Sequence, residues 1–241
     1  MAGHSKFKNI MHRKGAQDKK RSSLFSKLSK EITVAAKMGG PDPAGNPRLR
    51  KALDEARSAN LGKEPIQRAL AKSSSKEGSA DYEELTYEGY GPGGVALLVA
   101  CLTDNRNRTY SEVRAAINKN GGNLGTPGSV AFGFQKKGQI LIDKAENKNL
   151  TEDQLLEWGL ESGLEELEQD PEGFEITCST EAFLDLKEAL EKQKIQMTSA
   201  EVAMIADNPV ELDDDKSETL EKITDALEDL DDVQKVWTSE A

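Results

Sequence analysis

The sequence is poor in the residues that build disulfides, zinc sites and nucleophilic catalytic centres. It contains 2 cysteines and 2 histidines among 241 residues, and both histidines, His4 and His12, lie in the first dozen positions. Cys101 and Cys178 have no further cysteine or histidine near them in the sequence. The chain therefore has too few of these residues for a disulfide framework, a Cys/His zinc site or a Cys–His nucleophile pair. Abundant carboxylates leave a carboxylate-based metal or hydrolytic site open, but catalysis is not the first expectation.

Long apolar runs are missing as well. No stretch approaches the ~20 apolar residues that a membrane-spanning helix needs, and the N-terminus has no apolar signal-peptide core. These absences predict a cytoplasmic protein without a membrane partner.

Charge is abundant but unevenly distributed. The formal net charge is −11, yet residues 1–72 carry +11, residues 73–140 balance to zero, and residues 141–241 carry −22. Because salt screens charges beyond roughly 8 Å, a separate basic module keeps its own field. The pattern predicts a basic binding module joined to an acidic body; the competing interpretation is a soluble protein with a lysine-rich tail.

The first part of the basic segment has no sustained periodicity. Residues 1–15 are therefore predicted to form a mobile basic arm. Apolar positions spaced by three and four residues then predict an amphipathic helix over 17–38, with Lys27 and Lys30 off its apolar stripe.

Two further helices complete the expected helical module. Glycines and prolines in 39–43 end the first helix, and Asn46 and Pro47 suit the N-cap and first position of a second one that ends near residue 60. A third helix is expected to start at Pro65. The module should present a basic outer surface.

A serine-rich linker at 73–79 separates this module from alternating strands and helices. Strands are expected at 95–102, 130–134, 139–143, 164–167, 174–178, 195–204, 210–212 and 233–238. Helices are expected at 109–120 and 151–162, each opened by a capping box, at 180–193, and around 220–230.

The order of these elements indicates the fold. Residues 136–205 read βαββαβ, a ferredoxin-like unit, and the flanking segments together form a second one. The predicted fold class is α+β with three domains, namely a helical module and two ferredoxin-like α/β domains, one inserted into the other. Their boundaries are expected at 1–77, at 78–135 together with 206–241, and at 136–205.

Two glycine- or arginine-rich segments are candidate phosphate sites. Residues 89–94 match G-x-G-x-x-G, but they precede a strand instead of opening a helix, so a rigid turn is the better interpretation. Residues 103–109 join a strand to a helix N-terminus, where Arg106 and Arg108 could hold a phosphate. A solvated loop in which Asp104 pairs with an arginine explains this segment equally well.

The arm is the richer candidate for nucleic acid. Its cations supply affinity by releasing counterions, and its planar side chains can stack on bases. The predicted nucleic-acid-binding residues are Lys6, Phe7, Lys8, His12, Arg13, Lys14, Lys19, Lys20, Arg21, Arg48, Arg50, Arg106 and Arg108. A tail that only aids solubility is the competing interpretation. The acidic triplet 213–215 lacks EF-hand spacing and is expected to be a solvated helix face.

Several segments along the chain form a recognisable set: MAGHSKFKNI with HRK at 1–14, EITVAA at 31–36, NPRLR at 46–50, YEGYGPGG at 87–94, residues 102–109, residues 121–125 and GSV at 128–130. In this order they resemble the YebC/PmpR family, which includes the mitochondrial translational activator of cytochrome c oxidase subunit I. The resemblance covers essentially the whole chain. It implies three domains, one split by another, with no cofactor, metal or catalysis.

The resemblance implies two alternative functions. Family members are usually described as DNA-binding transcriptional regulators, and some instead as translation factors that act on ribosomes and help synthesis through proline-rich stretches. Because no helix-turn-helix signature is clear, phosphate contacts are favoured over base-edge readout. We expect a non-enzymatic, nucleic-acid-binding regulator whose partner is duplex DNA or ribosomal RNA. Two further hypotheses are a protein-interaction adaptor acting through the acidic domains and a nucleic-acid-modifying enzyme with a carboxylate site.

Overall fold

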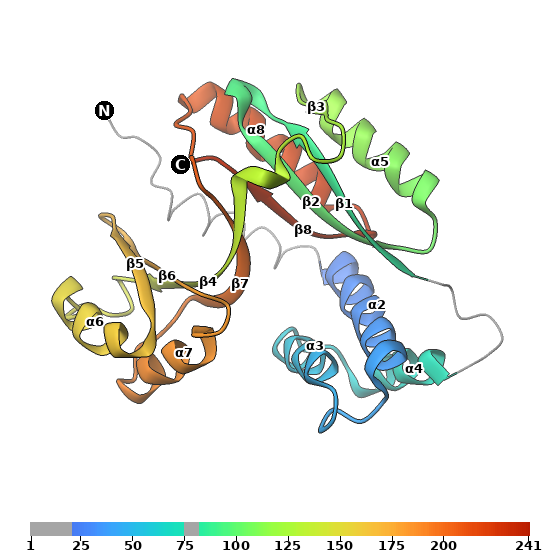
Figure 1. Ribbon diagram of the computed structural model, residues 1–241. Helices are drawn as coiled ribbons and strands as arrows, with labels where there is room; N and C mark the ends of the chain where they lie inside the picture. The colour runs from blue at the N-terminus through green and yellow to red at the C-terminus, as the bar shows by residue number, and fades with distance from the viewer. Residues whose placement is uncertain (1–20, 75–81) are drawn as a thin grey trace.

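The computed structural model describes residues 21–74 and 82–241, and Figure 1 shows three groups of elements along them. The first group consists of three helices: α2 (Arg21–Gly39), α3 (Pro47–Ser58) and α4 (Lys63–Ser74). The linker predicted at 73–79 overlaps the end of α4 at residues 73–74, and its remaining residues, 75–79, lie outside the described residues.

Asn46 fixes the connection between the first two helices. Its side-chain oxygen accepts a hydrogen bond from the Leu49 backbone N–H at 3.0 Å, which caps α3, and its amide donates to the carbonyls of Ala35 and Gly40 at 2.7 and 2.8 Å. Pro47 occupies the first turn of α3, where a missing N–H costs no hydrogen bond. The predicted start of α3 is confirmed, whereas α4 begins two residues before the expected Pro65.

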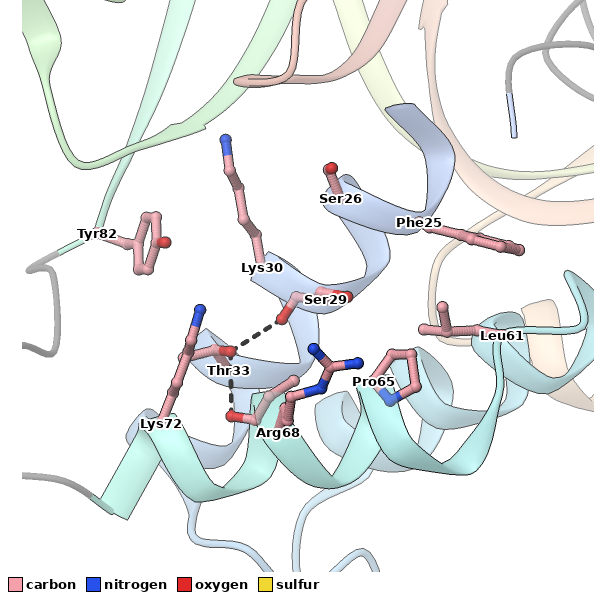
Figure 2. A pocket seen from close by; sticks show the side chains of 11 residues that line it. Phe25, Ser26, Ser29, Lys30, Thr33, Leu61, Pro65, Arg68, Lys72 and Tyr82 are labelled. Atoms are coloured by element: carbon pink, nitrogen blue, oxygen red, sulfur yellow. Dashed lines mark hydrogen bonds between the residues drawn. The ribbon is translucent and has the colours of Figure 1, made fainter. Parts of the chain in front are cut away.

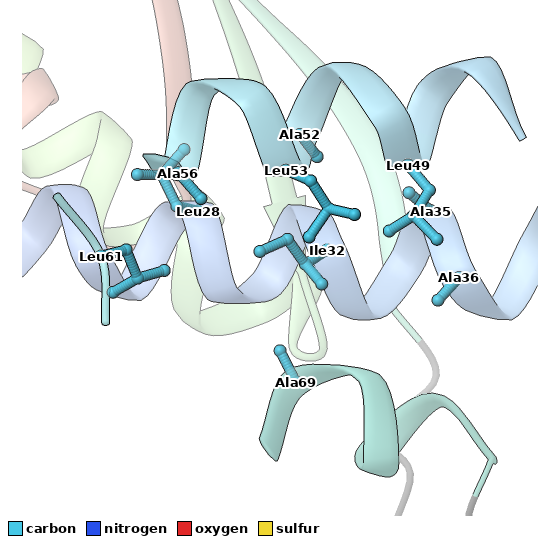
Figure 3. Packing of buried hydrophobic residues seen from close by; sticks show 10 residues of the cluster. All are labelled: Leu28, Ile32, Ala35, Ala36, Leu49, Ala52, Leu53, Ala56, Leu61 and Ala69. Atoms are coloured by element: carbon cyan, nitrogen blue, oxygen red, sulfur yellow. The ribbon is translucent and has the colours of Figure 1, made fainter. Parts of the chain in front are cut away.

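The three helices enclose their own hydrophobic core, shown in Figure 3. Its buried members are Leu28, Ile32, Ala35, Ala36, Leu49, Ala52, Leu53, Ala56, Leu61 and Ala69. They include most of the predicted apolar stripes of the first two helices, so the helical periodicity was a correct guide to this core.

The second group is an antiparallel sheet with strand order β3-β1-β2-β8. Its strands are β1 (Glu83–Tyr90), β2 (Ala96–Thr103), β3 (Asn123–Leu124) and β8 (Val233–Thr238). Two helices, α5 (Arg106–Lys119) and α8 (Asp214–Glu228), pack against it through a core that includes Val99, Val113 and Ile223.

The third group is a second antiparallel sheet with order β5-β6-β4-β7. Its elements are β4 (Phe134–Asp143), α6 (Glu152–Gly159), β5 (Leu164–Gln169), β6 (Gly173–Cys178), α7 (Phe183–Lys192) and β7 (Ser199–Ala206). All of them lie between β3 and β8 in the chain, in the βαββαβ order expected. The capping box of Thr151 and Gln154 is present at the start of α6.

The second βαββαβ unit expected from the flanking segments does not form, because the elements around this sheet follow the order β1-β2-α5-β3-α8-β8. The reasons lie in two of its segments. Strand β1 was not predicted, because its sequence Glu-Glu-Leu-Thr-Tyr-Glu-Gly-Tyr is polar and acidic. The strand expected at 130–134 is instead a short 3₁₀ turn at Ala131–Gly133 followed by β4. The reason is Glu88, whose buried carboxylate accepts hydrogen bonds from the backbone N–H groups of Gly128, Val130 and Ala131 at 2.6–2.8 Å and holds them away from any sheet.

Two local features were also misplaced. Helix α5 begins at Arg106 with Asn105 as its N-cap, so the capping box expected at Thr109 does not form. The strand expected at 210–212 is reduced to one bridge between Val210 and Glu240.

The glycine-rich segment at 89–94 joins the antiparallel strands β1 and β2, as the turn interpretation predicted. Gly93 has a φ of +68°, a left-handed conformation that favours glycine. Among the described residues, no helix is long and apolar enough to cross a membrane.

Candidate nucleic-acid interface

Most of the predicted nucleic-acid-binding residues lie outside the described residues. These are Lys6, Phe7, Lys8, His12, Arg13, Lys14, Lys19 and Lys20, while Arg21 begins α2 with a backbone that is described and a side chain that is not. Their role stays a prediction. The structure places the remaining four, Arg48, Arg50, Arg106 and Arg108.

Arg48 ties the helical module together and to the first sheet. Its guanidinium makes a two-pronged hydrogen bond to the carboxylate of Glu31 on α2, at 2.6 and 2.9 Å, and lies 2.6 Å from a carboxylate oxygen of Glu84 on β1. The hydrogen bond to Glu31 is the largest influence raising the pKa of Arg48 above its ordinary value. Arg50, two residues later on α3, is exposed and makes no ion pair among the described residues.

Arg106 and Arg108 lie on the first turn of α5 and both pair with carboxylates. Arg106 meets Glu83 at 2.9 Å and remains largely exposed. Arg108 contacts Asp104 at 2.8 Å and Asp232 at 2.6 Å. Asp104 therefore pairs with an arginine, as the solvated-loop interpretation of this segment supposed.

Asp232 is the centre of a polar cluster at the start of β8. Its carboxylate is almost fully buried and accepts hydrogen bonds from the hydroxyls of Thr103 and Thr109 at 3.1 and 2.8 Å, besides those from Arg108. On its other oxygen it accepts a hydrogen bond from the ammonium group of Lys30 on α2. Four side chains from three elements thus converge on one carboxylate.

These contacts explain the shifted pKa of Asp232. Burial alone would raise the pKa of Asp232, but the hydrogen bonds from Lys30, Arg108 and Thr109 outweigh it and lower the pKa to about 2. The thiol of Cys101 is also buried, and that burial together with the charge of Asp232 raises its pKa to about 12, which leaves an unreactive thiol at neutral pH.

Helix α2 docks on the first sheet domain through lysines that the sequence placed on an outer basic surface. Lys27 donates a hydrogen bond to the Glu228 carbonyl at 2.6 Å, in the last turn of α8, and Lys30 donates to the Asp231 carbonyl at 3.0 Å. The last carbonyls of a helix lack intrahelical partners and carry partial negative charge, so a lysine is a favourable cap there. Burial lowers the pKa of Lys27, with the nearby acids opposing that shift.

The docking reduces the set of cations available to a ligand. Lys27, Lys30, Arg48 and Arg108 are all engaged within the molecule. Apart from Asp104, which the sequence offered as a partner for an arginine, their partners lie 17 or more residues away in the chain and were not predicted. The one sequence signal that could have suggested it is the acidic run at 228–232, directly before the last strand.

A metal centre finds no support in the described part of the chain. No group of three or more histidine, cysteine, aspartate or glutamate side chains is arranged there to hold an ion. Asp232 is surrounded by cations and hydroxyls, so its charge is already compensated.

Comparison with known proteins places this arrangement in a family. The family model described as "TACO1/YebC protein N-terminal domain" matches residues 5–76, and the one described as "TACO1/YebC second and third domain" matches residues 82–239. A protein from Geobacillus thermodenitrificans named "Probable transcriptional regulatory protein" is 52% identical, over 98% of this chain and 96% of that protein. A protein of the same name from Ligilactobacillus salivarius is 52% identical, over 99% and 98% of the two chains.

A solved structure agrees with the fold. The crystal structure of a conserved hypothetical protein from Aquifex aeolicus superposes with a TM-score of 0.78 at 41% identity, covering 93% of this chain and 92% of that one. The helical module and both four-stranded sheets therefore fall within the shared part. On the family models, which together span nearly the whole sequence, the chain belongs to the TACO1/YebC family.

Proposed function

We propose that this chain is a nucleic-acid-binding regulator of gene expression that does not act as an enzyme, with the basic segment of residues 1–72 as its principal contact. The names of its close relatives support a role in transcription. The observation that carries the proposal is the partition of charge, +11 in residues 1–72 against −22 in residues 141–241.

The structure supports a basic binding module that is separate from the acidic part of the chain. The helical module, α2 to α4, has a hydrophobic core separate from those of the two sheets, so this described part of the basic segment is a distinct folded unit. A ligand drawn to it by charge would be repelled by the acidic second sheet, which favours binding in one orientation.

The pairing of the arginines narrows the mode of binding. Sequence readout in duplex DNA relies heavily on arginines that present two donors to a guanine, yet Arg48, Arg106 and Arg108 present theirs to carboxylates. The proposal therefore assigns phosphate contacts to the arm residues, from Lys6 to Arg21, and to Arg50. Binding of this kind follows backbone shape more than sequence.

Contacts of that kind favour a second candidate, a translation factor that binds ribosomal RNA. Folded RNA is recognised mainly by shape and by phosphate and ribose contacts, which a lysine-rich arm on a docked helical module can make. A protein-interaction adaptor that works through the acidic domains is distinguished from both, because its binding would survive removal of residues 1–72.

We further propose the domain division at 1–77, at 78–135 with 206–241, and at 136–205. The second sheet has the strand order of a ferredoxin-like unit, and it interrupts the chain between the strands of the first.

The test compares two charge-matched variants of the full chain. Replacing Lys6, Lys8, Arg13 and Lys14 by alanine should weaken binding to a labelled duplex across unrelated sequences, and should flatten the dependence of log affinity on log salt by about 0.9 per lost phosphate contact. The control replaces Lys148, Lys187, Lys192 and Lys194 of the second sheet domain, and should leave both quantities unchanged.

The partner is then identified by co-sedimentation with purified ribosomes at physiological salt, with excess random duplex DNA as competitor. Retention on ribosomes would make translation the primary role, and loss to the competitor would favour transcription. An unchanged salt slope in the arm variant would refute the role assigned to the arm.

A further inference from the structure

A cavity of about 420 Å³ lies between α2 and α4, beside the residue that precedes β1. Figure 2 shows it with Phe25, Lys30 and Thr33 on α2, Arg68 and Lys72 on α4, and Tyr82 at the edge. The function proposed above does not involve this cavity. Its volume falls in the range of about 300–1,000 Å³ that is usual for small-molecule sites.

The hollow exists because the side chains between the two helices are small. Ser26, Ser29 and Thr33 face it from α2, and Ala69 faces it from α4. The Thr33 hydroxyl donates to the carbonyls of Ser29 and Ala69, at 2.9 and 3.1 Å, which fixes the spacing of the helices. Helices held at this distance by such short side chains leave space that a ligand can fill.

The lining has two chemically different ends. Phe25, Leu61 and Pro65 form an apolar end with one aromatic ring, whereas Lys72 and Tyr82 lie at the opposite end in Figure 2. The side chains lining the cavity, all within the described residues, include three cations and no carboxylate.

Two of the three cations, Arg68 and Lys72, are exposed residues of α4 that line the cavity. Arg68 meets Glu64 at 3.4 Å, but both side chains are largely exposed, so this pair is weak. Lys30 is already paired with the carboxylate of Asp232 and is therefore not counted among the donors available to a ligand. A phosphate at this end would meet cationic donors, which make shorter and stronger hydrogen bonds to it than neutral donors do.

We propose that this cavity binds a nucleotide, with its phosphate toward Arg68 and Lys72 and its base against Phe25 and Pro65. A nucleotide joins a planar ring to an anion, and the two ends of the cavity match these two parts. Stacking on an aromatic ring tolerates any base, since every base has a π-face. The occupant is a free mononucleotide or one unit of a single strand, and in the second form the inference rests on the proposed function.

The experiment uses the full chain and three probes. Calorimetric titration with 5′-AMP is compared with titration by inorganic phosphate, and fluorescence anisotropy follows a labelled ten-nucleotide single strand of adenosines. One double variant, Arg68→Ala with Lys72→Ala, removes exposed charges of the cavity without touching its core. The matched control, Lys51→Ala with Arg57→Ala, removes two exposed cations of α3.

A second variant tests the apolar end. Phe25→Leu keeps an apolar side chain against the helical core but removes the stacking surface, and should weaken nucleotide binding about fivefold or more. The cavity double variant should weaken it about tenfold or more, while the α3 control should lose less than twofold. Circular dichroism spectra matching the wild type show that each variant is folded.

The outcomes separate this proposal from the proposed function. Binding of 5′-AMP, weakened by the cavity variants, supports a mononucleotide site even if the single strand does not bind; the proposed function would then be in doubt. Strand binding that falls only in the cavity variants, without AMP binding, supports the single-strand form. If AMP does not bind and the single strand binds wild type and cavity variants equally, nucleotide binding in the cavity is refuted and the proposed function still stands. Phosphate binding as tightly as AMP, or no binding of any probe, also refutes nucleotide binding there.

Discussion

Replacing Asp232 by asparagine should uncouple the helical module from the first sheet domain. The carboxylate accepts hydrogen bonds from four side chains, those of Lys30, Arg108, Thr103 and Thr109. Asparagine keeps the size but loses the charge, and its amide nitrogen would point a donor at other donors. The substitution therefore removes the attraction and adds a mismatch at the same point.

The magnitude follows from the titration of the aspartate. Its pKa of about 2, against an ordinary 3.8, corresponds to about 2 kcal/mol of stabilisation of the charged form. Removing one member of a buried ion pair costs about 3–5 kcal/mol, but Lys30 and Arg108 keep side-chain exposures of 18% and 43% and can be partly solvated. We therefore expect about 3 kcal/mol of destabilisation at pH 7.

The effect should depend on pH with a defined sign. Because the folded-state pKa lies below the ordinary value, the contribution of Asp232 is complete above about pH 5 and is lost as the pH falls from about 4 toward 2. The difference between wild type and Asp232→Asn should therefore shrink to roughly half by pH 3.

Urea unfolding followed by circular dichroism, at several values between pH 3 and pH 7, measures the difference. Hydrogen exchange locates it, because backbone amides of α2 and the first turn of α5 should lose protection while those of the second sheet keep theirs. Asp231→Asn, at the exposed neighbouring position, is the matched control. A loss no larger than the control's, or one independent of pH, would refute the reasoning.

Two further predictions concern the turns of the first sheet. Glu88→Gln should cost about 1–3 kcal/mol and raise amide exchange at 128–131, because the buried carboxylate that accepts three backbone hydrogen bonds becomes an amide; Glu83→Gln, at an exposed ion pair, is the control in the same urea titration. Gly93→Ala should lower the melting temperature, since Gly93 has a φ of +68° and an added Cβ would lie 2.5 Å from a leucine methyl group. Gly45→Ala, which meets nothing within 4 Å, should leave that temperature nearly unchanged, and equal shifts in the two variants would contradict the assignment.

The helices were predictable where their signals were local. The caps that Asn46 and Thr151 form bind backbone groups within three residues, so the sequence contains the whole capping interaction. The capping box expected at Thr109 failed because a competing cap was better placed. Thr103 accepts a hydrogen bond from the Asn105 N–H, and Asn105 caps the helix one turn earlier.

The strands were less predictable where a distant group overrode a local pattern. Alternating apolar residues at 130–134 satisfy the strand period, but Glu88, some forty residues earlier, binds the backbone donors of this segment. In β1 the reverse happened, because a strand formed where none was expected. Its polar sequence gave little sign of a strand, and pairing with β2 along its whole length makes it one.

The sequence by itself determined the family, the βαββαβ order of the second sheet, the core of the helical module and the separation of basic from acidic segments. These follow from composition, from periodicity and from contacts between near neighbours in the chain. Only the tertiary structure decided which cations face solvent, because an ion pair depends on distance in space. Lys27, Lys30, Arg48 and Arg108 found their partners in other elements, and the small side chains between α2 and α4 became a cavity only when those helices packed.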